Sequence, residues 1–134
     1  MPTYDEHNMN VGRTFPWHEV YTANLDATVD FYTKALGFGT EKMNMGQGDY
    51  TMLTMNGMGV AGVMDTNTLD HPNVPPHWAA YLSVDDVDAR LAKCKEMGAT
   101  VLVDPMDIPK VGRMALIQDP QGSVIWLFKG SEEM

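Results

Sequence analysis

The strongest constraint on the fold of this chain is an internal repeat. The stretch Trp17 to Asp26 continues into a helical pattern that ends at Gly37, and the stretch Ala79 to Asp88 continues into a second helical pattern that ends at Gly98. The two stretches align with a gap of one residue. Each predicts a strand, a polar helix cap, a short amphipathic helix and a glycine stop, which together indicate a duplicated supersecondary unit.

Three further strand patterns follow each helical pattern. In the first unit they cover about residues 39–45, 50–55 and 60–64. In the second unit they cover about residues 100–103, 113–118 and 123–129. The order is therefore βαβββ twice. Because either unit is too small to bury its own sheet face, we predict an α+β fold in which two βαβββ units form one eight-stranded, curved, cup-like mixed sheet with the helices on its outside.

Length and composition indicate one globular domain. The chain has 134 residues, of which 44% are hydrophobic and 20% are charged, which suffices for a core without disulfide support. We predict a flexible N-terminal arm at residues 1–14 and a C-terminal tail at residues 130–134. Between them, a single domain at residues 15–129 consists of unit one at about 15–64, a linker at 65–76 and unit two at about 77–129.

Charge and segment composition exclude several function classes. The formal net charge of −9 repels phosphate backbones and anionic lipid headgroups, so we expect no nucleic-acid partner and no membrane partner. We find no apolar segment typical of a signal peptide or a membrane span. The one cysteine, Cys94, cannot form an internal disulfide. We therefore expect a cytoplasmic protein.

Several motifs carry a family resemblance. They are Phe31-Tyr32 in the first helix, Leu36-Gly37-Phe38 at its exit, Val84 to Asp88 before the second helix, and Asp119 to Gly122 before the last strand. Together they resemble the vicinal oxygen chelate superfamily, which includes glyoxalase I, bleomycin-resistance proteins, fosfomycin-resistance enzymes and extradiol dioxygenases. The motifs Trp17-His18-Glu19, Pro76-His77-Trp78, Ile108-Pro109 and Val111-Gly112-Arg113 look more specifically like its glyoxalase-like or bleomycin-resistance-like branch. The resemblance also implies a homodimer.

The resemblance implies one divalent metal ion, held by His, Gln or Glu side chains from four strands. In this chain the corresponding positions are Trp17, Gly62, Ala79 and Trp126. None of them can donate a lone pair to a metal ion, so we predict no metal site at these positions and expect no cofactor. His18 is one residue away, but a shift by one residue reverses the face of a strand, and His18 would need a bulge to take part.

Glu19 and His77 form the candidate catalytic pair. If the first strands of the two units run antiparallel with Trp17 level with Ala79, then Glu19 lies opposite His77 inside the cup. Such residues could act as an acid and base, hold a divalent ion weakly with two donors, or form a satisfied polar pair. The sequence leaves these three interpretations open.

Aromatic residues dominate the predicted inner face and are the candidate ligand-binding residues. Alternation along the strands gives Trp17, Tyr21, Tyr81, Trp126 and Phe128. If these rings leave a pocket rather than fill the cup, it favours a flat, apolar or weakly cationic small molecule, because ring faces stack on such ligands.

Arg113 is the candidate partner for a ligand carboxylate. It follows Val111-Gly112 at the mouth of a predicted hairpin. Arginine binds carboxylates well, but such a residue can equally pair with a carboxylate of its own chain.

Three functions follow from these patterns. The first is metal-independent binding of a small planar or aromatic ligand by a glyoxalase- or bleomycin-resistance-like protein. The second is an enzyme of the superfamily, a lyase, isomerase or dioxygenase, that uses Glu19 and His77 with or without a divalent metal ion. The third is an interaction or structural module whose filled cup supports a dimer.

Overall fold

The computed structural model describes residues 14–44, 48–69 and 74–131. The chain divides into two compact parts. The first part is Trp17–Ala79, and the second part comprises the described residues from Ala80 onward together with residues 14–16. Apart from Thr14, the arm predicted at residues 1–14 lies outside the described residues.

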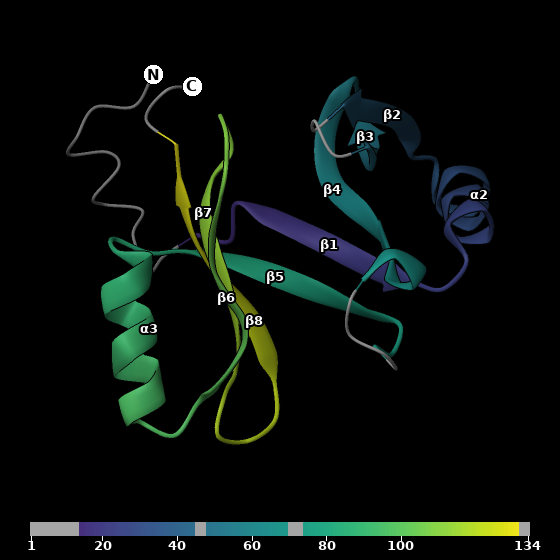
Figure 1. Ribbon diagram of the computed structural model, residues 1–134. Helices are drawn as coiled ribbons and strands as arrows, with labels where there is room; N and C mark the ends of the chain where they lie inside the picture. Colours follow the sequence, from purple (N-terminus) through teal and green to yellow (C-terminus); the bar gives the residue numbers. More distant parts are fainter. Residues whose placement is uncertain (1–13, 45–47, 70–73, 132–134) are drawn as a thin grey trace. The chain divides into compact units, whose positions relative to one another are not determined.

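The first part has four strands and one α-helix (Figure 1). Its elements are β1 (Trp17–Thr22), α2 (Leu25–Leu36), β2 (Gly39–Asn44), β3 (Asp49–Met55) and β4 (Met58–Asp65). The strands lie in the order β2-β3-β4-β1, with β1 parallel to β4 and the other pairs antiparallel. A 3-10 helix, Thr66–Thr68, lies within the predicted linker.

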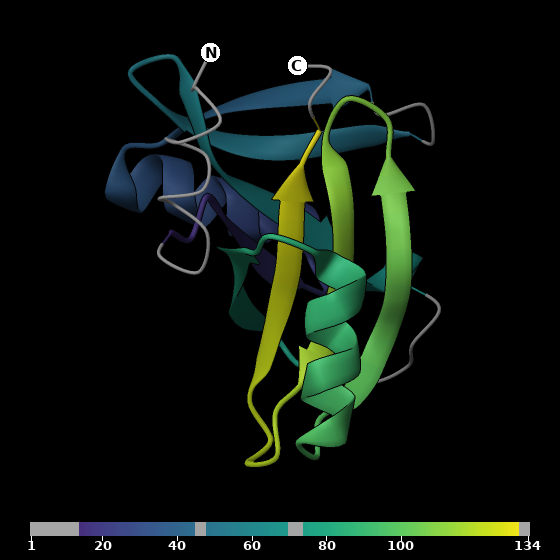
Figure 2. The same ribbon diagram turned by 90° about the vertical axis from the view of Figure 1, so that its left-hand side faces the viewer.

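The second part repeats this plan (Figure 2). Its elements are β5 (His77–Ser83), which starts at the end of the first part, α3 (Val87–Glu96), β6 (Thr100–Ile108), β7 (Gly112–Gln118) and β8 (Val124–Gly130). The strands lie in the order β5-β8-β7-β6, with β5 parallel to β8 and the other pairs antiparallel. The predicted α+β class, with mixed strand pairing and two βαβββ units, is confirmed.

Matching caps begin the two helices. The Asn24 side chain accepts a hydrogen bond from the Ala27 amide at 3.0 Å, and the Asp86 side chain accepts one from the Ala89 amide at 3.0 Å. Each bond satisfies one of the backbone donors that a helix start leaves free. Gly37, at φ +80°, then ends α2 in the left-handed conformation that favours glycine.

Strand β6 is longer than predicted. The sequence pattern predicts an end near Val103, whereas the strand continues to Ile108 and includes Pro105. Its pairing with β7 shifts register between Val101 and Val103 and again between Val103 and Met106. These irregularities accommodate a proline, which has no N–H for a regular ladder.

In each part, one face of the strands packs against the helix of the same part. In the first part the core consists of Val20, Leu53, Ala61 and Val63, packed against Leu25, Val29, Tyr32 and Phe38. In the second part it consists of Val84, Val87, Leu91, Ala115, Ile117 and Leu127. Because side chains alternate along a strand, the residues between these core positions lie on the face turned away from the helix. We call this the open face of each part. Neither helix in the described part of the chain is long and apolar enough to cross a membrane.

Candidate functional site

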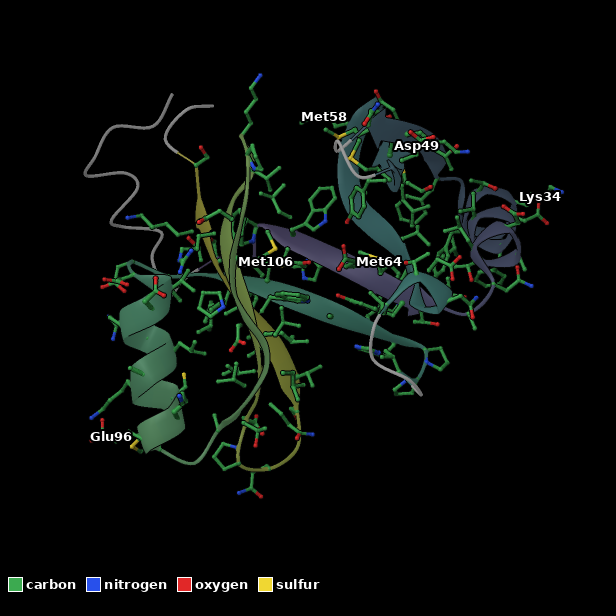
Figure 3. The ribbon with its side chains drawn as sticks, viewed as in Figure 1. Lys34, Asp49, Met58, Met64, Glu96 and Met106 are labelled. Carbon is green, nitrogen blue, oxygen red and sulfur yellow. The ribbon has the colours of Figure 1, made fainter. Side chains whose placement is uncertain are left out.

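The open face of the first part carries a buried carboxylate. Val20 packs on the α2 side of β1, so Trp17, Glu19 and Tyr21 lie on the open face. Glu19 pairs with Gly62 of β4, and Tyr21 pairs with Met64, which is labelled in Figure 3. The exposed fraction of Glu19 is 2%. A carboxylate that is buried this deeply needs hydrogen-bond donors.

Two tyrosines supply such donors to Glu19. The Tyr21 hydroxyl donates to Oε1 at 2.6 Å, and the Tyr50 hydroxyl donates to Oε2 at 2.5 Å. The Trp17 indole N–H in turn donates to the Tyr50 oxygen at 3.1 Å. Each carboxylate oxygen therefore receives a charge-assisted hydrogen bond from within the first part. We call Trp17, Glu19, Tyr21 and Tyr50 the tyrosine–carboxylate cluster.

The cluster keeps Tyr50 protonated. Burial raises the pKa of the Tyr50 hydroxyl, and the negative charge and hydrogen bond of Glu19 raise that pKa further. A phenolate would face the carboxylate across a short hydrogen bond in a largely buried place, where water screens the two charges poorly. Tyr50 is therefore a hydrogen-bond donor at neutral pH and well above it.

Gly62 makes room for this arrangement. A Cβ at this position would overlap the Tyr50 hydroxyl and the ring carbon that bears it. The absence of a side chain at position 62 is thus what lets the Tyr50 hydroxyl reach Glu19 across β4. From the sequence, Gly62 was expected only to be a position without a metal ligand, and the role of Tyr50 was not predicted.

His77 contacts the tyrosine–carboxylate cluster through Tyr21. The two rings stack with centroids 4.8 Å apart and planes 6° apart. The Nδ1 atom of His77 lies 2.7 Å from the Pro75 carbonyl oxygen. Tyr21 thus contacts both members of the predicted catalytic pair, as a hydrogen-bond donor to Glu19 and as a stacking partner of His77. Catalysis by this pair stays a prediction.

The superfamily's metal positions do not suit a metal ion here. The side chains of Trp17 and Trp126 are indoles, and that of Ala79 is a methyl group. At Gly62, the Tyr50 hydroxyl occupies the space that a ligand side chain would need. Within residues 14–44, 48–69 and 74–131, no three His, Cys, Asp or Glu side chains gather as a metal-binding group. His18, the possible substitute ligand, lies exposed on the strand β1. The residues present therefore do not fit the ion that the fold family implies.

The second part brings three of the predicted ligand-binding rings together. Tyr81 pairs with Trp126 in the parallel register of β5 and β8, and their rings stack at 5.1 Å with planes 2° apart. Phe128 meets Tyr81 edge to face at 6.1 Å. Tyr81 and Trp126 are buried. These rings form an aromatic cluster on the face turned away from α3, while Trp17 and Tyr21 belong to the first part.

Arg113 pairs with carboxylates of its own chain, the alternative that the sequence left open. Its Nε and Nη2 atoms donate to the two carboxylate oxygens of Asp88 at 2.8 and 2.9 Å, and Nη1 donates to Asp107 at 2.9 Å. These hydrogen bonds raise the pKa of Arg113 and lower the pKa of Asp88. A ligand carboxylate would have to displace one of these partners.

A groove that sequence analysis did not identify lies beside α2 in the first part. Its volume is about 410 Å³, and residues of β1, α2 and the start of β5 line it. The Trp78 indole donates a hydrogen bond to the Tyr32 hydroxyl at 3.0 Å, and the two rings meet edge to face at 5.6 Å. Both residues belong to motifs of the family resemblance, Phe31-Tyr32 and Pro76-His77-Trp78. The sequence shows both motifs, but it does not show that they contact each other.

Comparison with known proteins identifies the family. Residues 14–127 match the family model described as Glyoxalase/Bleomycin resistance protein/Dioxygenase superfamily. The chain therefore belongs to this superfamily, as the sequence motifs predicted.

Two curated relatives are similar over most of this chain. A Mycobacterium tuberculosis protein with the provisional name glyoxylase CFP32 is 36% identical over 122 residues, which is 90% of this chain and 46% of that protein. The anthracycline biosynthesis protein DnrV of Streptomyces peucetius is 30% identical over 125 residues, or 82% of this chain and 45% of that protein. The chain thus spans about half the length of these relatives.

Solved structures share the fold. A superfamily member from Vibrio splendidus has a TM-score of 0.58 at 14% identity, covering 85% of this chain and 96% of that one. A methylmalonyl-CoA epimerase in complex with methylmalonyl-CoA has a TM-score of 0.55 at 25% identity, covering 88% of this chain and 94% of that one.

Proposed function

We propose that this superfamily member binds a small planar or aromatic molecule without the help of a metal ion. The observation that carries metal independence is the tyrosine–carboxylate cluster. Tyr50 takes the space of a side chain at Gly62, and the two oxygens of Glu19 accept hydrogen bonds from tyrosines. A metal ion at Glu19 would have to share both carboxylate oxygens with tyrosine hydroxyls and would find no second side-chain ligand at Gly62.

The class of ligand is supported by the distribution of aromatic rings. Tyr81, Trp126 and Phe128 pack together in the second part, and Tyr32 and Trp78 meet in the groove of the first. Ring faces bind other flat, polarisable molecules by stacking. DnrV is named for anthracycline biosynthesis, so an anthracycline belongs in a panel of candidate ligands.

Two measurements test the proposal. Metal analysis of protein purified without a chelator should find well below one divalent ion per chain. Titration with a panel of flat molecules, including an anthracycline, a flavonoid and a dihydroxyanthraquinone, should quench the tryptophan fluorescence saturably. About one ion per chain that is lost in Glu19→Gln would refute metal independence. A panel without any saturable quenching would refute ligand binding and favour the filled-cup module.

The alternative is a metal-dependent or acid/base enzyme of the same superfamily, a lyase, isomerase or dioxygenase, that uses Glu19 and His77. One observation favours it: Tyr21 contacts both residues, and such a chain of groups can position a proton donor and acceptor. Similarity to a methylmalonyl-CoA epimerase supplies one substrate to assay. Turnover that falls by a factor of about a hundred or more in Glu19→Gln and in His77→Asn would favour the enzyme.

The expected assembly and location are also proposals. We propose a cytoplasmic homodimer, in line with the superfamily resemblance. Sedimentation velocity at several protein concentrations tests the dimer, and fractionation of the native source tests the location.

A further inference from the structure

We propose that the planar molecule binds in the groove beside α2, and that this groove selects a neutral ring system bearing both a hydrogen-bond donor and an acceptor. The inference rests on the proposed function for its ligand class and adds the site and the selectivity. It depends on Phe31, Tyr32, His77 and Trp78, all of which line the groove in the first part.

The size of the groove suits a small molecule. Its volume of about 410 Å³ lies within the range of about 300–1,000 Å³ that is typical of small-molecule sites. The groove is thus large enough for a few fused rings that keep one edge toward solvent.

The walls of the groove offer aromatic faces whose orientation is fixed. Tyr32 meets both Phe31 and Trp78 edge to face, at 5.2 and 5.6 Å and with planes 87° apart in each pair. The Trp78 indole is also held by its hydrogen bond to Tyr32. Phe31 is nevertheless 57% exposed and Trp78 46% exposed, so both rings keep surface for stacking. Fixed rings bind at a lower entropic cost than mobile ones.

Two polar atoms can give the groove directional selectivity. The Pro75 carbonyl can only accept a hydrogen bond, so Nδ1 of His77 carries a proton, and in the tautomer that bears this proton alone Nε2 is a hydrogen-bond acceptor. The Tyr32 oxygen accepts from Trp78, which leaves its own O–H to be donated. A phenol group and a carbonyl oxygen on one flat molecule match this acceptor and this donor.

The lining favours a neutral ligand. Among the described residues that line the groove, none is Asp, Glu, Lys or Arg. A charged molecule would lose hydration on entry and gain no opposite charge. Flat hydroxylated quinones therefore fit the groove better than flat cations or carboxylates.

The test uses 2,6-dihydroxyanthraquinone as the probe and the full chain as the protein. Equilibrium dialysis should show saturable binding that Phe31→Ala weakens about tenfold, because the substitution removes one stacking face. Leu36→Ala is the matched control, since Leu36 lies on the same helix, is 55% exposed and does not line the groove. This control should bind like the wild type. Anthraquinone without hydroxyl groups should bind about fivefold more weakly.

Fluorescence locates the probe independently. The Trp78→Phe variant retains only the indoles of Trp17 and Trp126, and at the same probe concentration its emission should be quenched much less than that of the wild type. If that variant does not fold, the dialysis comparison of Phe31→Ala with Leu36→Ala decides alone. Equal binding by these two variants would overturn the groove as the site and leave the proposed function standing. No saturable binding of any panel molecule by the wild type would overturn both.

Discussion

Replacing Gly62 by alanine tests the tyrosine–carboxylate cluster most directly. The added methyl group overlaps the Tyr50 hydroxyl and its ring carbon, so the ring must move and lose its hydrogen bond to Glu19. A lost hydrogen bond to a buried charge costs about 1.5–3 kcal/mol, and displacing a packed ring adds about 1–3 kcal/mol. We expect Gly62→Ala to lower the free energy of unfolding by about 3–5 kcal/mol.

Urea unfolding, followed by tryptophan fluorescence, measures this loss. With a denaturant slope of about 2 kcal/mol per molar, the unfolding midpoint should fall by about 1.5–2.5 M. Gly59→Ala is a control on the same strand. The three atoms nearest to a Cβ there belong to the flexible Met52 side chain and the edge of Trp17, and the nearest is the Met52 sulfur at 3.1 Å. That control should cost less than about 1 kcal/mol.

A double-mutant cycle separates the clash from a general intolerance of alanine. Gly62 is not among the glycines with positive φ, so its backbone accepts alanine. In a Tyr50→Ala background the obstacle is gone, and Gly62→Ala should then cost less than about 1 kcal/mol. An equal cost of Gly62→Ala in both backgrounds would show that Tyr50 is not what the methyl group displaces. A cost below about 1 kcal/mol in the wild type would refute the packing argument itself.

Four further outcomes are expected. The pKa of Tyr50 is raised above its ordinary value of 10.0, so above pH 10 the folded chain keeps a proton that the unfolded chain loses. The free energy of unfolding should therefore fall as the pH rises above 10. In urea unfolding at a series of pH values, Tyr50→Phe should show a smaller fall of this free energy than the wild type. Asn24→Ala and Asp86→Ala should each cost about 1 kcal/mol in urea unfolding, and a loss at only one cap would contradict the equivalence of the two units. Arg113→Gln should lower the thermal midpoint at neutral pH. The difference from wild type should shrink in 1 M salt, and it should also shrink as the pH falls from about 4 toward the lowered pKa of Asp88, because the contribution of that lowered pKa is lost there. Chelator or added Zn²⁺, Ni²⁺ or Mn²⁺ should leave the thermal midpoint unchanged, whereas a saturable rise of several degrees would reveal a metal site.

The sequence predicted the repeated local structure because its signals are local. Asn24 and Asp86 stand where a helix start needs an acceptor, and Gly37 stands where the chain must adopt a positive φ. Such signals depend on neighbours a few residues away. The βαβββ order could therefore be predicted from either unit alone, and the repeat reinforced it.

The residues of the tyrosine–carboxylate cluster could not all be predicted from local signals. Alternation along β1 placed Trp17, Glu19 and Tyr21 on one face, as the structure has them. The partner of Glu19 that matters most, Tyr50, is 31 residues away and reaches Glu19 only because of the register of β3 on β4. Register between strands depends on turns and packing over the whole sheet, and the sequence of one strand does not specify it.

The groove beside α2 could not be predicted from the sequence for a related reason. Tyr32 and Trp78 are 46 residues apart, and their contact depends on where the start of β5 passes the helix α2. Each ring taken alone is an ordinary aromatic residue in a family motif. The hydrogen bond between them is what fixes the angle of the indole and makes the groove a candidate site.

Within the first part, the tyrosine–carboxylate cluster and a metal ligand on β4 exclude each other. A His, Gln or Glu at position 62 needs a Cβ in the space that the Tyr50 hydroxyl occupies. Conversely, while Tyr50 donates to Glu19, each oxygen of that carboxylate already accepts at least one tyrosine hydrogen bond, which competes with a cation for the same negative charge. Adding one ligand to this chain therefore cannot create a metal site at this place. A metal ligand at position 62 would require a smaller residue at position 50 as well, so the residues at these two positions must be substituted together.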